Sequence, residues 1–309
     1  MNDSTEASQV LPLHASVKAV LSTLLCFFFL YVNSVMVFAL LKKPVLLQSP
    51  RYVLFGHLLV TDSLQLVGTM LLYVLALTRI RMVSYVCITF VLIATSTVKL
   101  SPLNLAIMSL ERYVAVCFPL RHPNIATSRT MGLAIAVIWT VASLDSFMLL
   151  IVFFSLENTS FILQKSCVKS AVFRLQIYFT LNKIFTVVYF ALVSVIIIYT
   201  YISIMITAKS ASSNASKASK AHKTMLLHLL QFCLCLTSTL FNMINTSGLL
   251  KMKRIVAVHI QYVFFLFLII LPKCLSPLLY GLRDQTFRHV FINYFTFGFK
   301  TRVTPSPKS

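Results

Sequence analysis

Residues 130–154, TMGLAIAVIWTVASLDSFMLLIVFF, form an apolar run that contains a single ionisable side chain, that of Asp145. About 20 apolar residues in a helix cross the roughly 30 Å hydrocarbon core of a bilayer, so this run is long enough to span a membrane. Composition agrees: the chain is 58% hydrophobic and only 11% charged, whereas a soluble domain carries about 25% charged residues. Most of the chain is therefore expected to lie in lipid.

Six further runs share this character, and we expect membrane-spanning helices at 16–41, 52–78, 84–116, 130–154, 177–207, 223–250 and 256–281. Backbone polar groups in lipid need partners within the protein, which leaves only helices and closed barrels. Barrel strands would alternate in polarity over short segments, and these runs are long and continuous. The predicted fold class is all-α, a seven-transmembrane helix bundle.

A final stretch, Arg283 to Phe295, carries Phe287, Phe291 and Tyr294 at helical spacing. This pattern predicts a short amphipathic eighth helix along the membrane surface. The expected organisation is an extracellular tail at 1–15, the seven-transmembrane bundle at 16–281, and the amphipathic helix with a cytoplasmic tail at 282–309.

The formal net charge is +20. A nucleic-acid partner would need a soluble basic face, so we expect instead basic loops beside anionic membrane lipid. With the N-terminus outside, the inner segments hold more Lys and Arg than the outer ones, as membrane proteins prefer. The sequons at Asn2 and Asn158 would then face outward, where glycosylation occurs, although Asn214 matches equally well and would face the cytosol. The polar N-terminal residues do not resemble a signal peptide. We expect a multi-pass plasma-membrane protein.

Ionisable side chains inside a span are costly unless they face the protein interior. Asp62 lies halfway along the second predicted span, where Asn33, Lys273 and Ser276 could reach it. Two interpretations stay open. The group is either a satisfied polar cluster that holds three helices in register, or a switch that rearranges during signalling.

A second set of ionisable groups lies in the third to fifth predicted spans. Lys99 and Asp145 fall at comparable heights on neighbouring helices and could form a buried ion pair. Alternatively, Lys99 points into a ligand cavity and meets an anionic or carbonyl group. Lys183 is a similar candidate.

Glu111-Arg112-Tyr113 ends the third predicted span and continues as VAVCFPLR to Arg121, which resembles the signature of rhodopsin-like G-protein-coupled receptors. A carboxylate beside an arginine at a helix end forms an ion pair that can be exchanged for groups of a partner protein. The resemblance also implies a disulfide between Cys87, at the outer end of the same helix, and Cys167 in the following outer loop.

The resemblance covers essentially the whole membrane domain. Asn33, Asp62, Arg112, Trp139 and Pro277 fall in the expected spans in the expected order. The stretch SPLLY, ending at Tyr280, is similar to the Asn-Pro-x-x-Tyr motif, with Ser276 in the first place. Its proline frees a carbonyl and permits a bend.

Within that family, the chain looks closest to odorant receptors of the fish and amphibian type. The stretch KAHKTMLLHL at 220–229, the pair Thr200-Tyr201 and the stretch GLRD at 281–284 are each similar to odorant-receptor segments. The sixth predicted span departs from the pattern, because it lacks both the Cys-Trp-x-Pro switch of most rhodopsin-like receptors and the Phe-Tyr-Gly of typical odorant receptors. The activation switch in that span is therefore unassigned.

The resemblance implies a small odorant bound in the outer half of the bundle, with the wall formed by Ala94, Thr95, Val98, Lys99 and Lys183. Ala94 stands where amine receptors carry an aspartate, so a cationic amine ligand is disfavoured. Lys99 and the basic outer loops favour an anionic or acceptor-rich ligand. The resemblance also implies that a heterotrimeric G protein of the stimulatory, olfactory type is activated through Glu111, Arg112, Tyr113, Tyr201 and Tyr280.

Other functions are open at this stage. A rhodopsin-like receptor could bind a lipid, nucleotide or pheromone, and the charges inside the spans could instead line an ion-coupled transporter. The sequence contains no nucleophile–base pair, metal cluster or phosphate loop, so we expect neither an enzyme nor a cofactor.

Overall fold

The computed structural model describes residues 3–78, 81–156, 165–167, 173 and 175–210, and the single positions 226, 229, 230, 232–234, 236, 237, 262, 263, 291, 294 and 295. The long helices in these ranges are α1 (Asp3–Leu41), α3 (Pro50–Thr78), α4 (Ser84–Cys117), α6 (Ser128–Leu156) and α8 (Gln176–Ser210). Each contains a stretch long and apolar enough to cross a membrane. The second to fifth predicted spans agree with these helices to within three residues at every boundary.

The first span differs from its prediction at the N-terminal end. The helix begins at Asp3, well before the predicted start at 16, although its candidate membrane span is only Val20–Leu41. Helical structure thus continues from the apolar part into the segment predicted as a tail. The predicted spans 223–250 and 256–281 and the eighth helix lie outside the described residues, apart from the single positions given above.

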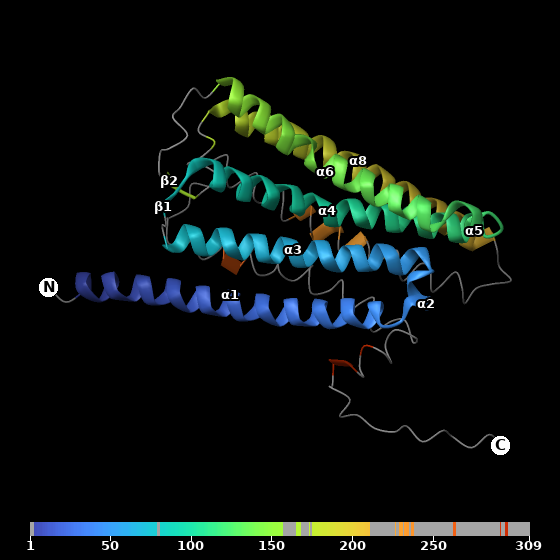
Figure 1. Ribbon diagram of the computed structural model, residues 1–309, viewed down its shortest axis with the longest axis horizontal. Coiled ribbons are helices and arrows are strands. Elements are labelled where there is room, and N and C mark those ends of the chain that lie inside the picture. The colour runs from blue at the N-terminus through green and yellow to red at the C-terminus, as the bar shows by residue number, and fades with distance from the viewer. Residues whose placement is uncertain are drawn as a thin grey trace, which may run out of the picture.

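The described helices lie side by side with their long axes roughly aligned (Figure 1). Helix α4 is central, because it contacts α3, α6 and α8, while α1 packs against α3. In the apolar stretch of α4 that could cross a membrane, 61% is buried inside the protein, against 28–39% in the corresponding stretches of the other four long helices. The buried polar side chains on α4, among them Thr97, Lys99, Ser101 and Asn104, therefore face protein, and their partners help to hold neighbouring helices together.

Helix α1 shows how one helix faces both lipid and protein. Its inward face carries buried Cys26, Met36 and Leu40, and the polar Ser22 and Asn33. On the opposite face, exposed side chains recur every three or four residues, at Val20, Leu24, Phe27, Tyr31, Ser34, Phe38 and Leu41. This spacing places them along one helical stripe. Two members, Tyr31 and Phe38, also meet the rings of Phe295 and Tyr294. The rest of this mostly apolar stripe is a surface suited to lipid contact.

The two ends of the bundle are built differently. At the end where α1 begins, β1 (Arg81–Met82) pairs antiparallel with β2 (Lys165–Ser166) (Figure 1). At the opposite end, the single-turn helices α2 (Pro44–Leu47) and α5 (His122–Ile125) connect the long helices. Each has a proline in its first turn, where the missing N–H costs nothing. Apart from this strand pair, the described part of the chain is helical, as predicted.

Candidate functional site

The centre of the bundle contains an ion pair between α4 and α6. The Lys99 ammonium contacts the carboxylate of Asp145. Both residues are buried, with exposed fractions of 8% and 2%. Of the two alternatives that the sequence left open for Lys99, the structure shows the ion pair. An ammonium held in this way can contact a ligand only if it shares or leaves Asp145.

The turn around Lys99 is also held by α8. Pro102 lies inside α4 and lacks a backbone N–H, so the helical hydrogen bonding is interrupted in the preceding turn. The Tyr189 hydroxyl donates a hydrogen bond to the Lys99 carbonyl oxygen. Nearby, the hydroxyls of Ser96 and Ser146 lie 2.8 Å apart and join α4 to α6 again. Sequence reasoning missed Tyr189, because no motif marks a residue that bonds a backbone carbonyl.

A second buried polar group lies between α3 and α4. The Ser101 hydroxyl donates to Asp62 Oδ1 over 2.5 Å, and both residues are fully buried. The amide nitrogen of Asn33 donates to the Ser63 hydroxyl at 3.1 Å, not to Asp62. Asn33 thus joins α1 to α3 through Ser63, the neighbour of Asp62, and its membership of a polar network with Asp62 stays a prediction. The other expected members, Lys273 and Ser276, lie outside the described residues, as does Pro277.

At the α5 end of α4, a single carboxylate contacts two basic side chains. Glu111 Oε2 lies 3.5 Å from Arg112 Nε, and Glu111 Oε1 lies 3.2 Å from His122 Nε2. The Glu111 side chain is 6% exposed, whereas those of Arg112 and His122 are 26% and 25% exposed. The adjacent acid and base predicted from the sequence are thus in contact. His122 was not predicted, although it directly follows the stretch that carries the family resemblance.

The same end of α4 packs against α8. The Tyr113 ring meets the rings of Phe118 and Tyr199 edge-on, with centroids 5.7 and 5.8 Å away. The Cys117 thiol lies 3.2 Å from the Thr207 hydroxyl. Tyr199, which was not predicted, is thus an α8 tyrosine whose ring contacts Tyr113. A meeting of Tyr201 with Tyr280 stays a prediction, because Tyr280 lies outside the described residues.

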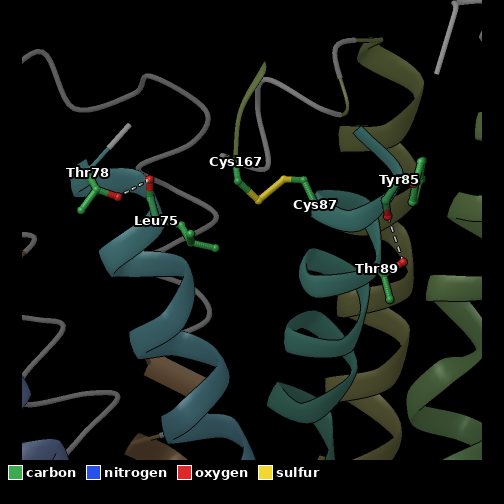
Figure 2. Close-up of a disulfide and its surroundings, with 6 residues drawn as sticks. All are labelled: Leu75, Thr78, Tyr85, Cys87, Thr89 and Cys167. Atoms are coloured by element: carbon green, nitrogen blue, oxygen red, sulfur yellow. Dashed lines mark hydrogen bonds between the residues drawn. A yellow bond between two sulfur atoms is a disulfide. The ribbon is translucent and has the colours of Figure 1, made fainter. Parts of the chain in front are cut away.

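The opposite end of α4 carries the disulfide that the resemblance implied. Cys87 and Cys167 are bonded, and their exposed fractions are 2% and 1% (Figure 2). The bond lies between the start of α4 and the end of α3, near Leu75 (Figure 2). Phe153 and Phe173 belong to the same buried cluster. The disulfide therefore ties the β2 segment onto the helices at this end.

The side chains predicted to form the ligand wall do not share one environment. Ala94 is buried against Gly68 of α3, where an added Cβ would stand 3.7 Å from the Ala94 Cβ. The Thr95 hydroxyl donates to carbonyls of its own helix. Val98 and Lys183 are exposed side chains on α4 and α8. A common ligand-facing wall for these residues, with Lys99, stays a prediction.

Trp139, predicted to be a structural residue, forms a hydrogen bond between two helices. Its indole N–H donates to His57 Nε2 at 3.0 Å, which joins α6 to α3. The tryptophan is 40% exposed, so its outer edge faces the surroundings of the bundle. The sequons Asn2 and Asn158 lie outside the described residues, and their glycosylation stays a prediction.

Comparison with known proteins adds a second line of evidence. Residues 32–280 match the family described as 7 transmembrane receptor (rhodopsin family). The chain is 30% identical to odorant receptor 131-2 of Danio rerio over 273 residues, which is 87% of this chain and 82% of that receptor. It is 33% identical to human olfactory receptor 2T1 over 123 residues, or 39% of this chain and 33% of that receptor. It is 35% identical to the olfactory receptor-like protein COR2 of Gallus gallus over 114 residues, or 35% of each chain.

Proposed function

Because the chain belongs to the rhodopsin family of seven-transmembrane receptors, we propose that it is an odorant receptor. In this proposal a small extracellular odorant binds within the bundle and activates a heterotrimeric G protein. The observation that carries it is the similarity to the zebrafish odorant receptor, which extends over 82% of that protein. A likeness of this extent includes the outer half, where a ligand enters, as well as the inner signalling end.

We place the receptor in the plasma membrane with its N-terminus outside. The disulfide between Cys87 and Cys167 supports this orientation, because such bonds form and persist in oxidising compartments. The opposite end carries the basic loops of α2 and α5, as expected for a cytosolic face. The Glu111–Arg112–His122 group then lies at the cytosolic end of α4.

Signalling is proposed to be a shift between two populations of the bundle. In the state described above, Glu111 holds Arg112 at 3.5 Å. An odorant that binds better to a state in which Arg112 has left Glu111 shifts the population toward that state. The freed guanidinium, with Tyr201 and Tyr280, then contacts the G protein, which we propose is of the stimulatory, olfactory type.

The proposed ligand class depends on which lysines of the bundle already form ion pairs within the protein. An anionic or acceptor-rich odorant was expected from Lys99 and Lys183. Because Asp145 neutralises Lys99, the exposed Lys183 of α8 now carries most of the support for that ligand class. A carboxylate that activates the receptor should therefore lose potency in Lys183→Gln more than a neutral odorant does.

The function is tested by expressing the receptor in cells that contain a stimulatory olfactory-type G protein and measuring cyclic AMP against an odorant panel. Arg112→Ala should abolish the response to any active odorant. Arg129→Ala is the matched control, because Arg129 is an exposed arginine at the same end of the bundle. Unchanged signalling in Arg112→Ala at equal surface expression would contradict the proposed mechanism. Responses confined to lipids or nucleotides would replace the odorant by another ligand class.

The interior cluster around Asp62 has a test of its own. If Lys273 pairs with Asp62, Lys273→Ala should reduce signalling or surface expression, and Asp62→Ala in the same chain should restore part of the loss. Single mutations that remove the same interaction are not additive. Strictly additive losses would show that the two residues act independently.

A further inference from the structure

Exposed apolar side chains are found on both sides of the point where α1 ends. The last members of the stripe on α1 are Phe38 and Leu41, with exposed fractions of 48% and 64%. Beyond the non-helical Lys43, with φ −121° and ψ 80°, Val45 in α2 is the most exposed of the three at 73%. Leu46, beside it, is buried in the core formed by α1 and α3. The α2 turn is thus anchored by one apolar side chain and presents another outward.

Cationic side chains lie directly beside this exposed apolar tip. Lys42 and Lys43 are exposed and separate Leu41 from α2. The Lys42 ammonium lies 5.4 Å from the centre of the Phe38 ring, so it stays next to the stripe. On the other side of α2, the Arg51 guanidinium stacks 4.5 Å from the Tyr52 ring centre. We call residues 41–51 the first inner loop.

The first inner loop has no negative charge near it in the sequence. Between Glu6 and Asp62 the chain contains no aspartate or glutamate. The loop joins α1 to α3 at the end of the bundle that carries α5 (Figure 1). A segment at the end of a membrane span that has an exposed apolar tip and carries only positive charges has the composition of an interfacial membrane contact.

We propose that the first inner loop binds an anionic phospholipid of the leaflet on the Arg112 side. Leu41 and Val45 contact the acyl chains, and the ammonium groups of Lys42 and Lys43 contact the headgroup phosphate and carboxylate. The candidate membrane span of α1 ends at Leu41, so the exposed Val45 lies only four residues beyond it, at the level of the bilayer surface. This position favours a lipid over a soluble protein. Only the naming of the leaflet depends on the orientation proposed above.

The proposal is tested by counting bound lipids with native mass spectrometry on the purified full-length receptor. The probe is dioctanoyl phosphatidylserine, compared with dioctanoyl phosphatidylcholine and with inorganic phosphate. Each cation near an anionic membrane surface contributes about a five-fold gain in binding. Lys42→Gln/Lys43→Gln should therefore weaken phosphatidylserine binding on the order of 10-fold or more, whereas Lys42→Arg/Lys43→Arg should retain it. Val45→Ser should weaken it as well, because the apolar contact is lost.

The matched control is Arg121→Gln/Arg129→Gln, which removes the same charge from exposed positions at the same end of the bundle. It should leave phosphatidylserine binding unchanged. An equal loss in this control would overturn the proposal, because the attraction would then be diffuse. Displacement of the lipid by inorganic phosphate would overturn it too.

A second measurement keeps the test valid if the lysine variant does not fold. Photoactivatable phosphatidylserine, added to the unaltered receptor in phosphatidylcholine nanodiscs, should crosslink to residues 41–51. Crosslinks confined to other segments would refute the site. The odorant response is measured in parallel: a receptor that binds this lipid but answers no odorant refutes the proposed function and leaves the lipid site standing.

Discussion

Replacing Lys99 by methionine removes one charge from the centre of the bundle while it keeps most of the side chain's length. Asp145, which is 2% exposed, then has no described cation beside it. Removal of one partner from a buried ion pair costs about 3–5 kcal/mol, because the remaining charge is desolvated without compensation. The Lys99→Met receptor should therefore lose about 3 kcal/mol or more of unfolding free energy. Asp145→Leu should lose a similar amount.

The double variant separates the ion pair from general damage. In Lys99→Met/Asp145→Leu neither charge is left alone, and apolar replacements of a buried pair are often close to neutral. The loss in the double variant should then be smaller than either single loss, and smaller than their sum by about 3 kcal/mol or more. Lys183→Met is the matched control, because this lysine is exposed on α8, and it should change stability by less than about 0.5 kcal/mol.

The assay is unfolding of the purified receptor in mixed micelles by increasing sodium dodecyl sulfate, followed by circular dichroism. It yields an unfolding free energy for each of the four members of the cycle. Additive losses would refute the reasoning, since they would mean that the two charges do not stabilise each other. So would a Lys99→Met receptor as stable as the unaltered protein.

Three other changes test the remaining contacts. Cys167→Ser opens the disulfide to Cys87, which closes a sequence separation of 80 residues; it should cost up to about 4.5 kcal/mol from loop-closure entropy, and equal melting temperatures with and without the bond would contradict this. His122→Phe removes the His122–Glu111 contact that the described, Arg112-paired state contains. Loss of about 1 kcal/mol of stabilisation from that state should raise odorant-independent cyclic AMP roughly five-fold, and unchanged basal signalling at equal surface expression would refute this. Trp139→Phe loses the indole hydrogen bond to α3 and should cost about 1 kcal/mol in the same unfolding assay, whereas no loss would show that the bond does not stabilise the fold.

The sequence alone determined the helices that cross the membrane, because length and polarity are properties of each segment by itself. The boundaries of α3, α4, α6 and α8 could be predicted to within three residues for this reason. The start of α1 could not be predicted in this way. Hydropathy indicates which residues lie in lipid, but it does not indicate whether a helix continues beyond the lipid into water. The disulfide and the contact of Glu111 with Arg112 came from a motif, and the structure confirms both.

Only the tertiary structure decided which polar groups meet. The sequence left two interpretations of Lys99 open, a buried ion pair and a ligand cavity, and it did not indicate Ser63 as the hydrogen-bond partner of Asn33. It gave no sign of Ser101 or His122. In lipid, nearly every face of these helices is apolar, so periodicity barely specifies how far each helix is rotated about its axis. That rotation is set by helix–helix packing, and it determines which buried donor reaches which acceptor.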